Sequence, residues 1–285
     1  MIRQLAAYRE RYYRILPGRE SLLRIIDEAE VPEHVYNSNA IENSTLTLEE
    51  TEKILNQMSL DRYITEREIF EARNLARVVG YISGKASEKD MDIEMMMLLN
   101  KMLMANINSE IAGRFRQTGE YVRVGTYIAP APERIEELIT GMLYNYRAVF
   151  DTTTIIKRLA RLHLSFEHIH PFIDGNGRIG RVIINYLLVR DGYVPVNIKF
   201  VDRQKYYEAF TEFDREEKTV IMEEILFKAL TNSYHKRLAY LEGREIITLG
   251  DYAKKMKLSH SNLLNKANRQ TIEAFLEKGI WKISI

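Results

Sequence analysis

Apolar residues recur every three or four positions through most of this 285-residue chain, and this spacing constrains its fold more than any other feature. The spacing places apolar side chains along one face of a helix, so it predicts amphipathic helices. Glycine and proline are scarce, with 14 and 6 residues. Because these two residues dominate turns, their scarcity argues against a fold of many short strands. The sequence therefore predicts a mainly all-α protein.

Short breaks separate the expected helices. These helices cover residues 21–30 (ending before Pro32), 48–58, 66–82, 92–104, 133–150, 154–168, 176–190, 203–214 and 220–241. Methionines are frequent in the helix over 92–104, and their thioethers fill irregular gaps in a core, which favours packing over ligand binding. Polar and apolar residues alternate between Gly113 and Pro132, and this alternation predicts a short β-hairpin.

Three regions are expected along the chain. Residues 1–90 form an N-terminal helical region, residues 91–241 a core, and residues 245–285 a small C-terminal module. In this module two short helices, the second with Ser259 as its N-cap, precede two extended runs. That order resembles an excisionase-type winged helix-turn-helix.

Composition excludes several classes of protein. The 41 basic and 40 acidic residues nearly cancel, so the whole chain has no excess charge for a polyanion. With no cysteine, the chain has no disulfide, no Cys-ligated zinc and no thiol catalysis. The longest apolar run, residues 182–189, is too short to span a bilayer, and the N-terminal residues lack a signal-peptide pattern. We therefore expect a cytoplasmic protein without a membrane partner.

The most informative motif is His170-Pro-Phe-Ile-Asp-Gly-Asn-Gly-Arg-Ile-Gly-Arg181. A glycine-rich loop here precedes a helix expected to begin near Asn176. The free backbone N–H groups at this helix start, together with the helix dipole, predict a site for an anion. Arg178 and Arg181 are three residues apart, share a helix face and suit a polyphosphate.

Two further side chains in the motif predict chemistry. Asp174 supplies a carboxylate oxygen of the kind that Mg²⁺ prefers beside nucleotide phosphates. His170, at the entrance of the loop, can accept a proton from an attacking hydroxyl. The segment thus combines a base, a metal ligand, an anion site and positive charge, which phosphoryl-type transfer requires.

This segment matches in full the signature of the Fic family, H-x-F-x-[D/E]-G-N-G-R-x-x-R, and the resemblance covers about residues 90–241. Fic proteins are mostly helical, and most transfer AMP from ATP to a Ser, Thr or Tyr hydroxyl of a protein. The resemblance implies that His170 deprotonates the hydroxyl and that Asp174 holds Mg²⁺. The implied ATP-binding residues of the motif are Gly175, Asn176, Gly177, Arg178, Ile179, Gly180 and Arg181.

Within this set, Asn176 and the glycine amides would bind the α- and β-phosphates, and the two arginines the β- and γ-phosphates. A phosphorylating branch of the family has lysine at the position of Gly177. The glycine here favours AMP transfer, although the nucleotide base is not specified by the motif.

Two neighbouring features also resemble the family. Val122-Arg123-Val124-Gly125 is similar to the flap, a hairpin that would bind a target peptide by strand addition. A purely structural hairpin is the alternative. Tyr206 and Tyr207 resemble the aromatic pair that lines the adenine pocket, with core packing as the alternative.

Ser38-Asn-Ala-Ile-Glu42-Asn43 resembles the inhibitory motif of the family, [S/T]-x-x-x-E-[G/N]. If Glu42 pairs with Arg181, this arginine cannot hold the γ-phosphate, and ATP binds unproductively. The position of the motif implies the branch that is inhibited from its own N-terminal helix. In some relatives the same glutamate assists removal of AMP, which is a further expectation here.

A metal-hydrolase site is an alternative reading of the histidine-rich run His163, Glu167, His168 and His170. The H-E-x-x-H arrangement is absent, and no second cluster supplies a third ligand. Packing and surface roles are therefore favoured for the first three of these residues.

A DNA-binding regulator is the alternative of a different class, with the core acting as a nucleotide sensor. Residues 248–285 hold seven basic and three acidic residues, a net charge of +4. Residues 260–268 would be the recognition helix and residues 271–285 a wing anchored by Trp281. Because this charge is modest for a duplex binder, protein docking is the competing role. The expected partners are a protein substrate, which includes the chain itself, DNA through this module, and a second copy in a homodimer.

Overall fold

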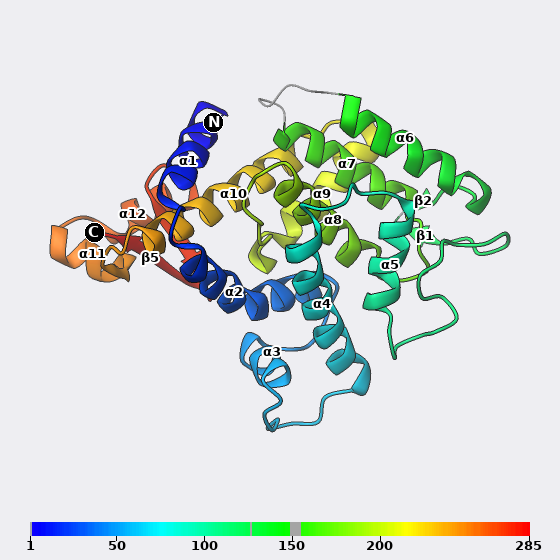
Figure 1. Ribbon diagram of the computed structural model, residues 1–285, viewed down its shortest axis with the longest axis horizontal. Coiled ribbons are helices and arrows are strands. Elements are labelled where there is room, and N and C mark those ends of the chain that lie inside the picture. Colours follow the sequence, from blue (N-terminus) through cyan, green and yellow to red (C-terminus); the bar gives the residue numbers. More distant parts are fainter. Residues whose placement is uncertain (1, 126, 149–154) are drawn as a thin grey trace.

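The computed structural model describes residues 2–125, 127–148 and 155–285, and confirms a mainly helical fold with two small antiparallel sheets (Figure 1). The helices are α1 (Ile2–Ile15), α2 (Glu20–Ile41), α3 (Leu48–Leu55), α4 (Glu66–Lys85), α5 (Ile93–Leu103), α6 (Ile135–Ala148), α7 (Ile155–Ile169), α8 (Asn176–Arg190), α9 (Arg203–Glu216), α10 (Val220–Leu241), α11 (Leu249–Met256) and α12 (His260–Asn268). The expected helix ends at Phe150 and Thr154 lie outside the described residues.

Local capping explains why several predicted helices begin near their expected residues. Thr47 accepts a hydrogen bond from the backbone of Glu50, whose side chain accepts one from the backbone of Thr47 in return, and this capping box starts α3. Asp92 similarly caps α5 by accepting from the Met95 N–H. These bonds satisfy N–H groups that the first helical turn leaves unpaired.

The prediction that the first amphipathic helix ends before Pro32 is wrong, because α2 continues to Ile41 with this proline inside it. Proline removes one helical hydrogen bond, yet most of the following residues are buried, among them Val35, Asn37 and Ser38. They pack against α3, α4 and α8. Tertiary burial of this half of α2 therefore outweighs the local effect of Pro32.

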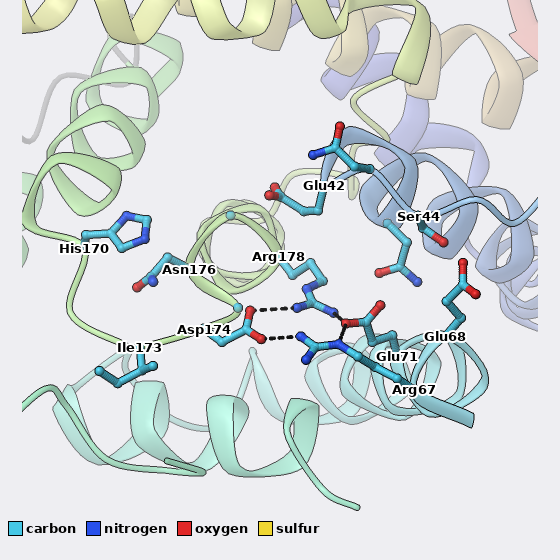
Figure 2. Close-up of a pocket in the computed structure, with 14 residues that line it drawn as sticks. Glu42, Ser44, Arg67, Glu68, Glu71, His170, Ile173, Asp174, Asn176 and Arg178 are labelled. Atoms are coloured by element: carbon cyan, nitrogen blue, oxygen red, sulfur yellow. Dashed lines mark hydrogen bonds and ion pairs between the residues drawn. The ribbon is translucent and has the colours of Figure 1, made fainter. Parts of the chain in front are cut away.

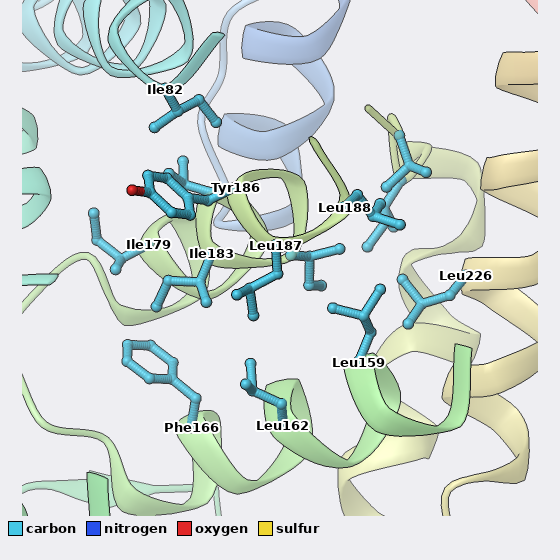
Figure 3. Packing of buried hydrophobic residues seen from close by; sticks show 14 of the residues in the cluster. Ile82, Leu159, Leu162, Phe166, Ile179, Ile183, Tyr186, Leu187, Leu188 and Leu226 are labelled. Carbon is cyan, nitrogen blue, oxygen red and sulfur yellow. The ribbon is translucent and has the colours of Figure 1, made fainter. Parts of the chain in front are cut away.

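A single hydrophobic core extends from Leu5 in α1 to Leu241 in α10. Its centre is the contact between α7 and α8, where Leu162 and Phe166 face Ile183 and Leu187 (Figure 3). Residues 1–90 and 91–241 share this core, so the N-terminal region is packed as part of the same body. Helix α1, which was not predicted from the sequence, packs against α10.

Residues 245–285 lie at one end of the molecule, opposite the hairpin of strands β1 (Arg123–Val124) and β2 (Tyr127–Ile128) (Figure 1). Strands β3 (Ile246–Thr248), β4 (Ala274–Glu277) and β5 (Ile280–Ser284) make an antiparallel sheet in the order β3-β5-β4. Ser259 caps α12 as predicted. The module has its own small core of Leu249, Ala253, Leu263, Ala267, Ala274 and Ile283.

The predicted hairpin is short. Strands β1 (Arg123–Val124) and β2 (Tyr127–Ile128) pair antiparallel, with Arg123 opposite Ile128. Among the described residues, no helix combines the length and the apolar character that crossing a membrane requires.

Candidate active site

The glycine-rich loop of the motif leads into the start of α8, where the anion site is predicted. Gly175 is the N-cap, with φ of +84°, a backbone conformation that L side chains rarely adopt. A Cβ atom on Gly175 would lie 2.9 Å from Leu103 Cδ2, so the loop also needs glycine for space. Asn100 steadies the loop by donating to the Asp174 carbonyl oxygen at 3.1 Å.

Asn176 holds the loop closed. Its side-chain oxygen accepts from the Phe172 N–H at 2.9 Å, and its amide donates to the Phe172 carbonyl, also at 2.9 Å. The side chain is 2% exposed and closes the loop on itself. One of the two amide N–H groups is therefore used within the loop, and contact of Asn176 with phosphate stays a prediction. The backbone N–H groups at the helix start remain the anion donors.

His170 lies on the wall of the pocket in a strained conformation. Its φ is +48°, in the left-handed region that favours glycine. Nδ1 lies 3.2 Å from the Glu167 carbonyl oxygen, and because a carbonyl can only accept, Nδ1 carries the proton. This leaves Nε2 as the proton acceptor. Burial lowers the pKa of His170, which keeps the imidazole neutral, as a base requires.

Arg116 holds this loop in place and was not identified from the sequence. It is 3% exposed and donates to the carbonyl oxygens of His170 at 2.8 Å, Glu120 at 3.0 Å, Pro130 at 2.9 Å and Ile169 at 3.2 Å. One guanidinium thus joins the catalytic loop to the flap segment. No motif marks Arg116, because its partners are backbone atoms from three separate segments.

The predicted pair of Glu42 and Arg181 is present. Glu42 Oε1 lies 2.9 Å from Arg181 NH1. Ser38 completes the contact, since its Oγ accepts from Arg181 Nε at 2.9 Å and its carbonyl from NH2 at 2.7 Å. The arginine is 3% exposed; although burial opposes its charge, the contacts with Tyr206 and Glu42 raise its pKa. Both ends of the Ser38–Glu42 motif therefore bind one cation.

Glu42 also lies beside Gly177, at the start of α8 where the anion site is predicted. A Cβ atom on Gly177 would lie only 2.0 Å from Glu42 Oε1. The carboxylate thus lies against the first turn of α8, where an anion is stabilised by the helix dipole. Glycine at position 177 is needed for this close approach.

Tyr206 is not part of the pocket wall. It is 1% exposed, and its hydroxyl accepts from Arg181 NH1 at 3.0 Å. The hydroxyl proton then points to His163 Nε2 at 2.7 Å, which fits a neutral imidazole because burial lowers the pKa of His163 to about 3. Tyr206 thus positions Arg181, which corrects its predicted place beside adenine. Tyr207 is 39% exposed and donates to the Ile41 carbonyl, and its adenine role stays a prediction.

Two other predicted ATP-binding residues face away from the pocket. Ile179 is fully buried in the core between α8 and its neighbours (Figure 3). A Cβ atom on Gly180 would lie 2.6 Å from Glu167 Oε1 and 2.8 Å from His163 Cε1. Both positions lie on the inner side of α8, so their predicted contact with ATP is wrong.

A pocket of about 370 Å³ lies over the start of α8. Its lining residues are Asn39, Glu42, Asn43, Ser44, Arg67, Glu68, Glu71, His170, Ile173, Asp174, Gly175, Asn176, Gly177 and Arg178. Figure 2 shows that Arg67 and Glu71 of α4 reach the motif from the side opposite His170. In the sequence these α4 residues resemble an ordinary charged helix face, and no motif marks them.

The other predicted residues lie in the β1–β2 hairpin and near the end of α7. Val122 accepts a backbone hydrogen bond from Ala129, which extends the β1–β2 pairing. Tyr127 of β2 lies against the end of α7, where its hydroxyl donates to the His168 carbonyl at 3.1 Å. His168 binds Asp214, and its ring does not converge with that of the buried His163. Peptide binding by the flap stays a prediction.

Comparison with known proteins shows which family and which proteins this chain is similar to. Residues 90–188 match the model of the Fic/DOC family. The chain is 30% identical over 213 residues to "Protein adenylyltransferase Fic" of Nematostella vectensis, covering 73% of this chain and 49% of that protein. It is 34% identical over 179 residues to the protein of the same name from Drosophila melanogaster, covering 61% of this chain and 36% of that protein. The chain thus spans half or less of the length of these curated relatives.

Solved structures share the fold over a larger part of this chain than the curated relatives cover. A Fic domain containing signaling protein from Bacteroides thetaiotaomicron has a TM-score of 0.74 and 23% identity, with 86% of this chain and 97% of that chain covered. A Fic family protein from Desulfovibrio desulfuricans has a TM-score of 0.66 and 20% identity, with 100% and 95% covered. The motif, the fold and the family match agree, and residues 90–188 of this chain are a domain of the Fic/DOC family.

Proposed function

We propose that this protein transfers AMP from ATP to a Ser, Thr or Tyr hydroxyl of a protein. The arrangement of His170 beside the anion site at the start of α8 carries this proposal. The names of the similar adenylyltransferases support ATP as the nucleotide and transfer of AMP as the reaction. The substrate protein, the chain itself as a target, a homodimer and a cytoplasmic location stay predictions.

The chemistry follows from the placement of the side chains. The hydroxyl oxygen forms a bond to the α-phosphorus of ATP, the bond from this phosphorus to the pyrophosphate oxygen breaks, and pyrophosphate leaves. The neutral Nε2 of His170 accepts the hydroxyl proton. Backbone N–H groups at the start of α8 and the Arg178 guanidinium stabilise the phosphate charge.

Asp174 fits the role of a magnesium ligand. It is the carboxylate of the motif loop on the pocket wall, with its side chain 31% exposed. Protein sites for Mg²⁺ beside nucleotides need only one or two carboxylates, because phosphates and water supply the other oxygens. When bound, Mg²⁺ would neutralise phosphate charge and orient the leaving group.

We further propose that Glu42 holds the activity low. Its carboxylate lies where a phosphate oxygen would contact Gly177, and it occupies Arg181 NH1. A γ-phosphate would have to displace a like charge from Arg181. ATP therefore binds with its phosphates misplaced until Glu42 moves. Removal of AMP with help from Glu42 stays a prediction.

Three variants test both proposals. The full chain is incubated with ATP, Mg²⁺ and a cell lysate, and incorporation of AMP is followed by mass spectrometry. Glu42→Gly should raise incorporation strongly, and Glu42→Gln should raise it less, because the amide loses the charge but keeps the volume. His170→Ala in the Glu42→Gly background should abolish it. If neither change at position 42 raises incorporation, the inhibitory role is wrong, and if no variant incorporates AMP, the transfer itself is wrong.

The DNA-binding alternative receives no support from the comparisons. Four of the seven basic residues in the C-terminal module already pair with carboxylates of the chain. Lys278 pairs with Glu52 at 2.7 Å and Lys282 with Glu277 at 2.6 Å, while Lys254 and Lys255 lie 3.9 Å from Asp251 and Glu245.

A further inference from the structure

Both carboxylate oxygens of Asp174 are bound by arginines. Oδ2 lies 2.6 Å from Arg67 NH2, and Oδ1 lies 3.2 Å from Arg178 NH2. Glu71 closes the ring, because its Oε1 contacts Arg67 Nε at 3.1 Å and Arg178 NH1 at 3.2 Å (Figure 2). The predicted metal ligand Asp174 is thus one of two carboxylates that alternate with two guanidiniums in a ring. The ring has no net charge.

The two arginines differ in how firmly they are held. The Arg178 side chain is 5% exposed and lies between Asp174 and Glu71. The Arg67 side chain is 58% exposed and reaches Asp174 from the surface of α4. Exposed ion pairs are weak, so Arg67 can leave Asp174 at small cost, whereas the buried Arg178 would leave two partly buried carboxylates if it moved.

The backbone of α4 is anchored beside Arg67. Glu68, the next residue, accepts hydrogen bonds from the N–H of Thr45 at 3.1 Å and from its Oγ1 at 2.7 Å. Thr65 caps the helix by accepting from the Glu68 N–H. Release of Asp174 therefore requires only rotation of the Arg67 side chain and no movement of the helix.

We propose that Arg67 is an internal counter-cation of Asp174, which a divalent metal must displace before it can bind. This inference rests on the proposed function only in taking Asp174 as the metal ligand. A divalent cation needs a free carboxylate oxygen, and Oδ2 is the one whose partner is exposed. Arg67 is thus a positioning residue that lowers the affinity of the site for metal. It lies outside residues 90–188, so it belongs to the N-terminal region and not to the matched family domain.

The competing role for Arg67 is direct help to the ligand, since an exposed guanidinium can also turn towards phosphate. The two roles predict opposite effects. If Arg67 is a counter-cation, its side chain weakens binding of the metal. If Arg67 is a phosphate ligand, its side chain strengthens binding of the metal together with the nucleotide.

Binding of Mn²⁺ to the full-length protein separates these roles. Free Mn²⁺ is followed by electron paramagnetic resonance during titration, with and without ADP, and no hydroxyl target is present. Arg67→Ala should bind Mn²⁺ up to about fivefold more tightly, the upper range for loss of an exposed ion pair. Arg77→Ala, at an exposed arginine of the same helix, should match the unmodified protein. Adding Asp174→Asn to Arg67→Ala should remove the gain.

Unchanged or weaker binding of Mn²⁺ by Arg67→Ala overturns the inference, and so does a gain that persists without the Asp174 carboxylate. Circular dichroism confirms that each variant is folded. The titration measures binding without AMP transfer. A protein that lacks the transferase activity can therefore still show the Arg67 effect, and an active enzyme can lack it.

Discussion

At the scale of single residues, the site depends on buried groups whose protonation is set by their surroundings. Glu167 is 8% exposed, and its Oε1 has no hydrogen-bond partner. Burial, followed by the nearby charge of Glu42, raises the pKa of Glu167 to about 8. The folded protein therefore keeps this carboxyl protonated near neutral pH, one helical turn from His170.

Glu167→Gln should remove a pH dependence of stability. The folded-state pKa of Glu167 is about 8 and its ordinary value is 4.5, so the folded state binds the extra proton between these values. This stabilisation is complete below pH 4.5 and is lost as pH rises through 8. From pH 5 to 9 the unfolding free energy of the unmodified protein should fall by about 2–4 kcal/mol more than that of Glu167→Gln. Urea unfolding across this range measures it, and parallel curves would contradict it. Glu94→Gln, at an exposed side chain, is the control.

Arg116→Lys should damage both the fold and the active loop. An ammonium group cannot reach the four carbonyl oxygens that the guanidinium binds, and each unpaired buried carbonyl costs about 1–3 kcal/mol. We expect a loss of about 2–4 kcal/mol in urea unfolding, together with reduced AMP incorporation in the Glu42→Gly background. Arg134→Lys, at a side chain 61% exposed, should change neither. Full stability of Arg116→Lys would show that water replaces the lost donors.

At the scale of elements, α2 joins Ser38 and Glu42 to the core. Its buried second half ends at Ile41, directly before Glu42, and Arg203 of α9 donates to the Ile41 carbonyl at 2.9 Å. The end of the helix is therefore held from two sides, by α9 and by Arg181 of α8. This fixation aims Glu42 at the start of α8.

Pro32→Ala tests whether α2 tolerates a regular backbone at its middle. Alanine restores one helical hydrogen bond and has a much higher helix propensity, so unfolding should require about 1–3 kcal/mol more free energy. Urea unfolding followed by circular dichroism measures this. A loss of stability would mean that the proline shapes α2 so that Ser38 and Glu42 reach Arg181. AMP incorporation by Pro32→Ala then shows whether inhibition is weakened.

At the scale of the whole molecule, buried charges join the C-terminal module to the N-terminal helices. Lys236 of α10 contacts Glu277 of β4 at 2.7 Å and Glu30 of α2 at 3.1 Å, and its side chain is 5% exposed. Glu33 of α2 accepts from the Lys278 N–H at 3.0 Å. The turn between β4 and β5 is therefore docked on the helix that carries the inhibitory motif.

Lys236→Met should weaken this docking. Methionine keeps the length of the side chain but leaves Glu30 and Glu277 with fewer cationic partners, and breaking a buried pair costs about 3–5 kcal/mol. Trp281, the single tryptophan, lies in the module and reports on it by fluorescence, while circular dichroism reports mainly on the helical core. In the variant, the midpoint of the fluorescence transition should lie at a lower urea concentration than the midpoint of the circular dichroism transition. Lys254→Met, at a side chain 84% exposed, should leave both transitions in place.

Several features could be predicted because they depend on residues close together in the chain. Helical spacing located most helices, and the glycine-rich string His170–Arg181 located the anion site at the start of α8. Glu42 and Arg181 were paired through their resemblance to a known motif. For these features, short-range geometry and a specific residue pattern are sufficient.

Other features depended on the tertiary structure, because they are set by which distant groups meet. Pro32 lies inside a helix because the residues after it are buried, and Tyr206 supports Arg181 because α9, which packs against α7, brings this hydroxyl to Arg181 of α8. Arg116 and Arg67 carry no motif, and their partners come from other segments. The sequence by itself determined the helical elements and the chemistry of the phosphate loop, since backbone spacing and local hydrogen bonds decide both. Only the tertiary structure decided which charges neutralise one another around that loop, because an ion pair depends on distance in space and not on separation in the chain.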